Sequence, residues 1–357
     1  MLKRKKASAE VFDALSLAGE GINKNICRSY EGITTKHPKA FGLIYHAGDL
    51  FSGIKIKSPI YLANSLYSSK LAAYIEENEI KAVVATHLFA AQAMSRIRNA
   101  GKSAVPYIFI MTDYTSFPFI WETKPNYLIA PSEELIEECV KKGTEKSKIM
   151  PYGIPVHPDF QIKVPKKEAR SNLGLPLDKL VYLIMCGSMG FGDIEELAKK
   201  TVSIYGGNIR LGILCGNNKA LFNSLTDTLG QEESVMPLQF TDKVSLYMDA
   251  ADVVFTKPGG LTSTEAAVKK IPIIHTRPIP GCEERNALFF SSRGMSFYSS
   301  DVVTQLFYAY KLACDESYRS EMKQAQKKYI NPNACENICD LAIDLAQSTE
   351  YQRQQNS

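Results

Sequence analysis

The chain has 357 residues, of which 45% are hydrophobic and 22% are charged, and its net charge at neutral pH is +4. This length allows two domains of ordinary size, and the composition excludes a disordered or fibrous protein. The net charge is too small to indicate a nucleic-acid partner, although it is compatible with an anionic membrane surface.

Targeting and redox features predict a cytoplasmic protein. The basic start Met1–Lys6 is followed by no apolar stretch, because Glu10 and Asp13 interrupt the next segment, so no signal peptide is expected. No window has the ~18 to 20 apolar residues of a membrane-spanning helix, so any membrane contact is expected to be peripheral. The eight cysteines show no C-x-x-C pair and no zinc-finger spacing, which indicates reduced thiols and no metal site.

The segment before residue 80 has weak periodicity. Ala9–Leu15 is predicted as a strand, and Asn25–Tyr30 and Ser65–Ile75 are predicted as helices. From residue 80 onward, short apolar runs alternate with helical patterns. The elements predicted here are strands at Lys81–Thr86, Tyr107–Met111 and Tyr127–Ala130, a helix at Leu88–Asn99 closed by Gly101, and a helix capped by Ser132 that stops at Gly143.

Pro151–Pro165 holds four prolines and little periodicity, which predicts a domain boundary. Beyond it the alternation restarts, and roughly the last 55 residues are predicted to be wholly helical. The strands predicted in this half are Leu180–Cys186, Arg210–Cys215, Ser234–Phe240, Val253–Thr256 and Pro272–Thr276. Because single helices separate the strands, the sequence predicts an α/β fold with two doubly wound, Rossmann-like domains facing a cleft.

Three loops of the second half follow predicted strands, where open parallel sheets bind their ligands. In Gly187–Gly192 and Lys257–Glu265, glycines let a ligand approach the backbone, and the helix that follows offers free amides to an anion such as a diphosphate. Glu265 can also accept hydrogen bonds from a ribose diol. The structural alternatives are tight strand-to-helix packing for the first loop and, for the second, a capping box between Thr262 and Glu265.

The third loop, Pro278–Asn286, carries Glu283 and Glu284 at a helix start. Acidic side chains are favourable there with the helix dipole whatever the function. Carboxylates also accept hydrogen bonds from sugar hydroxyls. Three such loops on one edge of one sheet favour a ligand site more strongly than any one of them does.

Two residues of the first half follow predicted strands in the same way. Asp113 comes after the strand at Tyr107–Met111, and His87 comes after the strand at Lys81–Thr86. An aspartate in this place can act as a general base if its geometry and pKa suit the proton that it removes. The structural alternative for Asp113 is an Asx-turn or a helix cap, and His87 has the same two interpretations.

Taken together, these loops resemble the monogalactosyldiacylglycerol synthase and diacylglycerol glucosyltransferase group of glycosyltransferase family 28. The most specific stretch is Asp252–Ala267, with Ile271–Ile274 and Pro278–Gly281 after it. The matching stretches of the first half, in the same order, are Thr112–Tyr114, Pro131–Leu135 and Gly153–Val156. The similarity runs from about residue 10 over nearly the whole chain, and the ordered set is far more specific than any one motif.

The resemblance implies the GT-B fold. It implies an incomplete acceptor-side domain at 1–160, a UDP-sugar donor domain at 161–330, and a C-terminal helix and tail at 331–357. The implied reaction transfers glucose or galactose from UDP-glucose or UDP-galactose to diacylglycerol or a glycosyldiacylglycerol, with inversion, on the inner face of the cell membrane. No metal or other cofactor is implied, because helix dipoles and amides can stabilise the leaving UDP.

The resemblance also implies roles for individual residues. On the acceptor side, Asp113 is the base that acts on the acceptor hydroxyl, and His87 and Tyr114 lie beside it. The implied donor residues are Gly187, Ser188, Gly190, Gly259, Gly260, Leu261 and Thr262 for the diphosphate, Phe240 and Thr241 for the uracil, Glu265 for the ribose, and Glu283 and Asn286 for the sugar.

Two departures from the family pattern bear on activity. The family opens with a strand and a Gly-Gly-Gly-His loop, and roughly 30 residues of that opening, with the histidine, are expected to be missing before Met1. This predicts an incomplete chain or impaired activity. Cys282 stands where the family commonly has glutamine, a stronger hydrogen-bonding partner, so the identity of the sugar stays open.

Membrane docking has weaker support. Between Lys141 and Arg170 there are eight basic and three acidic residues, and four bases lie near the N-terminus. Such patches can hold anionic head groups at about 1 kcal/mol per charge, although a solvated surface is the ordinary explanation. Two other functions stay open: a non-catalytic nucleotide-sugar-binding protein, and an N-acetylglucosaminyltransferase that acts on a polyprenyl-linked precursor.

Overall fold

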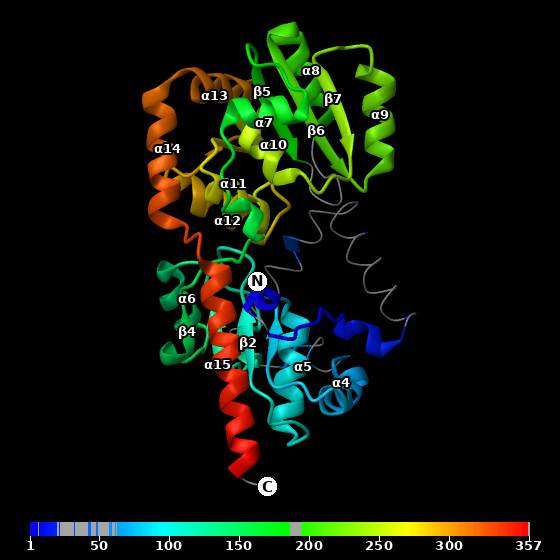
Figure 1. The fold of residues 1–357 in the computed structure, drawn as a ribbon, viewed down its shortest axis with the longest axis vertical. Coiled ribbons are helices and arrows are strands. Elements are labelled where there is room, and N and C mark those ends of the chain that lie inside the picture. Colours follow the sequence, from blue (N-terminus) through cyan, green and yellow to red (C-terminus); the bar gives the residue numbers. More distant parts are fainter. Residues whose placement is uncertain are drawn as a thin grey trace. The chain divides into compact units, whose positions relative to one another are not determined.

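In the computed structural model, the described residues are 1–5, 7–19, 21, 32, 42–43, 48, 57–58, 61, 63–185 and 194–355. The chain forms two compact units, shown in Figure 1. Unit 1 consists of Met1–Pro155 and Pro332–Ser357, and unit 2 consists of Val156–Asn331. The chain therefore enters unit 2 within the proline-rich segment and returns to unit 1 for its last helix.

Unit 1 contains a parallel sheet of four short strands in the order β1-β2-β3-β4. Its strands are β1 (Val83–Ala85), β2 (Tyr107–Ile110), β3 (Tyr127–Ile129) and β4 (Ile149–Met150), and its helices are α4 (Ser65–Glu77), α5 (Leu88–Asn99), α6 (Ile136–Lys141) and α15 (Ala334–Gln355). Short 3₁₀ turns add Leu2–Lys5 and Ala14–Ala18 near the N-terminus. Glycines with positive φ follow α5 and α6, at Gly101 and Gly143, as expected where a helix ends.

The residues of β2 alternate between two hydrophobic clusters, because successive side chains of a strand point to opposite faces. Tyr107 and Phe109 pack with α4 and α5. Ile108 and Ile110 pack instead against Ile338 and other apolar residues of α15. The C-terminal helix therefore covers one face of the unit 1 sheet.

Unit 2 contains a six-stranded parallel sheet in the order β10-β9-β8-β5-β6-β7. Its strands are β5 (Leu180–Met185), β6 (Ile209–Gly216), β7 (Val235–Gln239), β8 (Val253–Thr256), β9 (Ile273–His275) and β10 (Phe297–Tyr298). Its helices are α7 (Lys166–Leu173), α8 (Ile194–Tyr205), α9 (Lys219–Leu229), α10 (Val244–Ala250), α11 (Gly260–Lys269), α12 (Cys282–Ser292), α13 (Val302–Cys314) and α14 (Glu316–Tyr329). The strand order reverses between β5 and β8, which is where doubly wound folds bind ligands.

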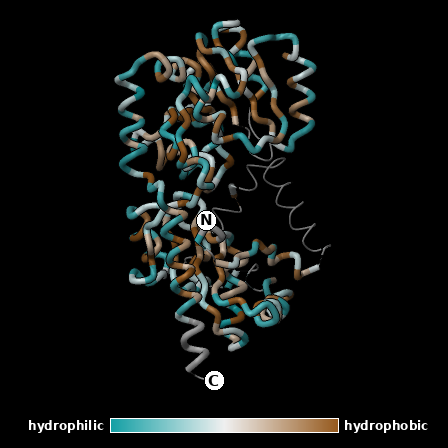
Figure 2. Tube along the Cα trace, in the orientation of Figure 1, coloured by the Kyte–Doolittle hydropathy of each residue, from teal (hydrophilic) through white to brown (hydrophobic). Residues whose placement is uncertain are grey.

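Helices cover both faces of the unit 2 sheet. Tyr182 and Ile184 of β5 join a cluster with α8, α9 and α13, whereas the neighbouring Val181 packs with α7 and α10. Figure 2 shows the hydrophobic colour following the strands and a more hydrophilic trace along α9 and α14. A sheet buried on both faces needs nearly continuous apolar strands, and the sequence Leu180–Met185 has this character.

The basic stretch from Lys141 to Arg170 spans both units, and two of its cations form an ion-pair cluster. The stretch divides between the two units at Pro155. Lys166 Nζ lies 2.6 Å from one carboxylate oxygen of Asp252, and an Arg170 guanidinium nitrogen lies 2.6 Å from the other. These two cations neutralise a carboxylate that is itself only 9% exposed, so they hold α7 against the start of β8.

Most of the predicted elements are confirmed, including the α4, α5, β8 and C-terminal helical segments. The strand predicted at Ala9–Leu15 is wrong, because the structure has a 3₁₀ turn at Ala14–Ala18 and no strand before it among the described residues. The helix predicted at Asn25–Tyr30 lies outside the described residues. The two-residue strands β4 and β10 were not predicted, since they are too short to show a period.

None of the helices in the described part of the chain is both long enough and apolar enough to cross a bilayer.

Candidate functional site

The parallel strands of unit 2 place the loops after β7, β8 and β9 at one edge of the sheet. The predicted donor residues of these loops are therefore brought to the same edge. Gly187, Ser188 and Gly190, which follow β5, lie outside the described residues.

Helix α11 begins with backbone amides that have no partner among the described residues. Its N-cap is Gly259, which has no side chain to cap the helix. Within the described part of the chain, the N–H groups of Gly260, Leu261 and Thr262 make no hydrogen bond to a protein atom. The capping box considered for Thr262 and Glu265 is wrong, because both residues lie inside the helix. The positive end of α11 is thus open to an anion.

Neither the backbone angles nor the packing of Gly259 requires a glycine. Its φ and ψ are −72° and 143°, which suit any residue. A Cβ built there would have Glu283 Oε1 as its nearest neighbour, at 3.9 Å, which is an ordinary contact. The missing side chain therefore leaves space in front of the open amides of α11.

Glu265 lies one turn further along α11. Burial raises the pKa of its carboxyl to about 7. The described structure gives it no hydrogen-bond or ion-pair partner. A half-buried carboxyl without a partner is costly to ionise, so a ligand that donates hydrogen bonds to it would be favoured at this place.

An ion pair joins the loop after β8 to the loop after β9. Lys257 Nζ lies 2.7 Å from Glu283 Oε1, and the backbone N–H of Ile279 donates to Glu283 Oε2 at 2.8 Å. Both oxygens of Glu283 are thus in use, and its side chain is 9% exposed. Gly281, at the start of α12, has a φ of 112°, a conformation that favours glycine.

The remaining predicted donor residues differ in exposure. Phe240 follows β7 and is 71% exposed, so its ring is free to stack on a planar base. The hydroxyl of the adjacent Thr241 accepts a hydrogen bond from the backbone N–H of Lys243 at 3.1 Å. Asn286, on α12, is fully buried, so it lies below the surface that would meet a sugar.

A buried histidine ties α11 to the sheet. His275, the last residue of β9, lies 2.9 Å by its Nε2 from the hydroxyl of Ser263 in α11, and 3.0 Å by its Nδ1 from the hydroxyl of Ser296. Complete burial lowers the pKa of His275 to about 3, so the imidazole is neutral at physiological pH. A neutral imidazole has one donor and one acceptor nitrogen, and the two serines satisfy both.

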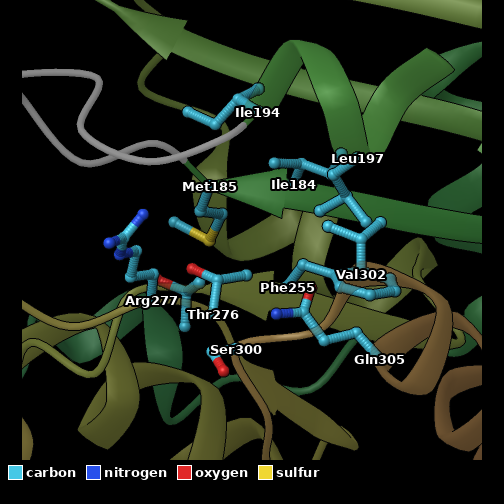
Figure 3. A pocket seen from close by; sticks show the side chains of 11 residues that line it. Ile184, Met185, Ile194, Leu197, Phe255, Thr276, Arg277, Ser300, Val302 and Gln305 are labelled. Atoms are coloured by element: carbon cyan, nitrogen blue, oxygen red, sulfur yellow. The ribbon is translucent and has the colours of Figure 1, made fainter. Parts of the chain in front are cut away.

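A small pocket lies where the strand order reverses. Figure 3 shows Met185, Thr276 and Arg277 on one side of it, with Phe255 and Gln305 on the other. Its volume is about 20 Å³, which is room for roughly one water molecule. This pocket is therefore too small for a nucleotide, and the open amides of α11 mark the better candidate.

In unit 1, the predicted acceptor-side residues follow the paired strands β1 and β2. His87 is the N-cap of α5, where its Nδ1 accepts a hydrogen bond from the backbone N–H of Phe89 at 3.3 Å. Asp113 is half-buried, and Tyr114 beside it is 3% exposed. The parallel pairing of β1 and β2 places all three at one edge of this sheet.

Comparison with known families accounts for most of the chain. Residues 2–156 match the family model described as monogalactosyldiacylglycerol (MGDG) synthase. Residues 181–330 match the model described as the glycosyltransferase family 28 C-terminal domain. The chain belongs to the MGDG synthase group of glycosyltransferase family 28. The boundary between the two matched regions falls where the chain leaves unit 1.

Curated relatives agree with this family. The chain is 29% identical over 264 residues to a processive diacylglycerol beta-glucosyltransferase of Bacillus pumilus. This match covers 72% of this chain and 68% of the relative. It is 27% identical over 304 residues to the protein of the same description in Bacillus subtilis, which covers 84% of this chain and 77% of the relative.

Solved structures share the fold. The UDP-GlcNAc 2-epimerase of Neisseria meningitidis, bound to UDP-GlcNAc, has a TM-score of 0.61 at 16% identity and covers 81% of this chain and 84% of its own. Acinetobacter baumannii MurG has a TM-score of 0.53 at 15% identity, and the match covers 78% of this chain and 77% of that protein. This family 28 chain therefore has the GT-B fold that was expected.

Two residues at this edge of the unit 2 sheet were not predicted. Lys257 stood within the glycine loop but was given no role, although a lysine directly after a buried strand, beside two glycines, is a sequence signal for an anion. His275 ends an apolar strand and gives no signal, because only the structure shows that Ser263 and Ser296 reach its two nitrogens.

Proposed function

We propose that the chain is a hexosyltransferase that transfers glucose or galactose from a UDP-sugar to diacylglycerol or a glycosyldiacylglycerol, with inversion. The observation that carries this proposal is the N-terminus of α11, where three amides have no partner in the described part of the chain and follow a glycine that backbone angles and packing do not require. The family membership supports the same reaction, and so do relatives described as processive diacylglycerol beta-glucosyltransferases.

In this proposal the donor lies along the carboxyl edge of the unit 2 sheet. The amides of Gly260, Leu261 and Thr262 hold the diphosphate, as helix N-termini do. Gly187, Ser188 and Gly190 are proposed to add to this cradle. Glu265 accepts hydrogen bonds from the ribose hydroxyls, and the exposed ring of Phe240, with Thr241, meets the uracil. Glu283 is assigned to the sugar side, and the buried Asn286 is assigned to the same side from below the surface.

In the proposed transfer step, a residue of unit 1 accepts the proton of the acceptor hydroxyl. An acceptor hydroxyl oxygen forms a bond to C1 of the sugar, and its proton passes to the carboxylate of Asp113. The bond between C1 and the β-phosphate oxygen breaks, and its electron pair leaves with UDP. The open amides of α11 stabilise the charge that develops on that oxygen. His87 and Tyr114 are proposed to line the acceptor side.

The lipid acceptor suggests where the chain works. Because diacylglycerol stays in the bilayer, we propose that the chain contacts the cytoplasmic face of the cell membrane peripherally. The lysines of Lys141–Lys148 are the better candidates for anionic head groups, since Lys166 and Arg170 already neutralise Asp252.

The test is transfer of radiolabelled glucose or galactose from the UDP-sugar to diacylglycerol in mixed micelles by the full chain. Asp113→Asn is expected to lower transfer by about 100-fold or more while UDP binding by calorimetry is retained. Asp227→Asn, an exposed aspartate of α9, is the matched control and should transfer normally. UDP binding without transfer would favour the nucleotide-sugar-binding alternative, and the absence of both would contradict the proposal.

A further inference from the structure

Lys257 has three properties that suit a residue that binds an anion, and the family resemblance gives it no role. It directly follows β8, so it stands at the carboxyl edge of the sheet. Its side chain is only 18% exposed, so its ammonium is partly removed from water. Among the described residues, the one hydrogen-bond partner of this ammonium is Glu283 Oε1, at 2.7 Å. An ammonium has three N–H donors, so two of them have no acceptor in the part of the chain that the structure describes.

The surroundings of Lys257 are rich in open donors. Glu283 Oε1, which contacts the ammonium, lies 3.9 Å from the position that a Cβ of Gly259 would occupy. Gly259 is the N-cap of α11, so Glu283 Oε1 and the ammonium that it contacts lie near the start of this helix, where the amides of Gly260, Leu261 and Thr262 have no partner among the described residues. A cation and a helix N-terminus next to each other form a strongly positive place, and a single carboxylate offsets it.

Glu283 is fixed independently of Lys257. The N–H of Ile279 donates to its second oxygen, and burial limits its other conformations. The carboxylate therefore holds the ammonium at the mouth of α11 without using its remaining donors. A purely structural ion pair that joins two loops is the simpler explanation, and it makes a different prediction about ligand binding.

We propose that Lys257 is a donor-binding residue whose ammonium contacts the terminal phosphate of the nucleoside diphosphate, and that Glu283 positions it for this contact. The proposal rests on the proposed function, because it names a further residue of the same donor site. The terminal phosphate is where negative charge develops when the sugar leaves, so the same contact lowers the barrier of transfer.

The test compares two variants that differ only at position 257. Lys257→Met alone would leave Glu283 buried and unpaired, which can unfold the loop region. We therefore use Glu283→Gln and the double variant Lys257→Met with Glu283→Gln in the full chain. Calorimetry with UDP should show binding in Glu283→Gln and at least about tenfold weaker binding in the double variant, as expected for a lost hydrogen bond between charged groups.

Uridine and a second lysine supply the controls. Uridine has no phosphate, so its affinity should be the same in both variants. Lys166→Met removes an ammonium that pairs with Asp252 at the opposite end of β8, at 2.6 Å. This variant should bind UDP as the unmodified chain does, because its charge lies far along the strand from the open amides.

The outcomes separate the two proposals. If the unmodified chain does not bind UDP, the proposed function fails first. If the chain binds UDP and the double variant binds it as tightly as Glu283→Gln does, Lys257 has only a structural role and this inference is overturned. This holds even if both variants bind UDP more weakly than the unmodified chain, because the loss would then come from the broken contact between the two loops and not from the ammonium.

Discussion

Gly259 and Gly281 are both glycines at helix starts, but the fold treats them differently. Gly281 has a φ of 112°, which a residue with a side chain adopts only under strain. Gly259 has ordinary angles and free space around its missing Cβ. Apart from its preference for the N-cap position, Gly259 has no conformational or packing reason to be glycine, which favours a ligand that needs the space, as a phosphate on exposed amides does.

Gly259→Ala is therefore expected to leave the fold intact and to weaken UDP binding. Its free energy of unfolding should change by less than about 1 kcal/mol, because the smaller unfolded-state entropy of alanine offsets its poorer N-cap preference. The UDP dissociation constant should rise about tenfold as the methyl group crowds the amides. Thermal unfolding and calorimetry measure the two quantities. Gly281→Ala is the contrast, with an expected stability loss of at least about 1 kcal/mol. Unchanged UDP binding in Gly259→Ala would contradict the diphosphate assignment.

Glu265 predicts a pH dependence whose sign follows from its raised pKa. Burial raises this pKa from 4.5 to about 7. As the pH rises, the folded state therefore keeps a proton that the unfolded state loses at a lower pH. The contribution of this group to stability is favourable below pH 4.5 and is lost as the pH rises toward 7. Glu265→Gln should therefore stabilise the chain at pH 8, by up to about 3 kcal/mol, and change little at pH 4.5.

The affinity for a ligand with ribose hydroxyls should instead increase as the pH rises. The ionised carboxylate is the stronger acceptor for ribose hydroxyls, so affinity should fall as Glu265 becomes protonated. Uridine is the suitable probe because it has no phosphate that titrates in this range. Its dissociation constant should rise about tenfold from pH 8 to pH 6. Glu265→Gln should show a flat profile. A slope that persists in this variant would assign the titration to another group.

At the scale of elements, α11 depends on a hydrogen bond at its first turns. Ser263 connects α11 to His275, and Ser296 connects the same imidazole to the segment before β10. The two serines form a matched pair, because each removal costs the same histidine one partner. Only the Ser263 contact fixes the helix whose N-terminus is proposed to hold the diphosphate.

Ser263→Ala and Ser296→Ala should therefore lose similar stability, about 1 to 3 kcal/mol, and differ in UDP binding. Ser263→Ala is expected to weaken UDP several-fold because α11 loses a lateral constraint, whereas Ser296→Ala should stay within about twofold of the unmodified chain. Denaturant unfolding measures the first quantity and calorimetry the second. Equal UDP affinities in the two variants would show that the histidine stabilises the core without positioning α11.

The elements that the sequence predicted well share one property. Strands such as Val253–Thr256 are continuous apolar runs bounded by turn residues, and α5 has a cap, a period and a closing glycine. Their local signals agree with the tertiary structure. Ala9–Leu15 was assigned wrongly because its alternation is short and no partner strand supports it. The contacts of Lys257 and His275 could not be predicted from the sequence, since they join residues of different elements that only the tertiary structure brings together.

At the scale of the whole molecule, the path of the chain is the least predictable feature. Periodicity showed that the last residues are helical, but it could not show that α15 packs on the first unit. Ile338 and Ala342 of α15 meet Ile108 and Ile110 of β2, which lie more than two hundred positions earlier. Unit 1 is therefore completed by a segment that is synthesised after unit 2.

Because α15 packs on unit 1, we expect a substitution in this helix to lower the stability of unit 1 and to leave nucleotide binding unchanged. Ile338 is 4% exposed, so Ile338→Asp places a charge in the apolar layer between α15 and β2 and should destabilise unit 1 by about 3 kcal/mol or more. UDP affinity, which we assign to unit 2, should stay within about twofold. Asp340→Ala, on the exposed side of α15, is the control and should change stability by less than about 1 kcal/mol.

Calorimetric scans of the full chain with and without UDP separate the two effects. UDP should raise the midpoint of the transition that reports unit 2, because a ligand stabilises the state that binds it. Ile338→Asp should lower the other transition and leave the shift caused by UDP unchanged. If Ile338→Asp abolished that shift, nucleotide binding would require an intact unit 1, and the donor site could not be assigned to the unit 2 residues alone.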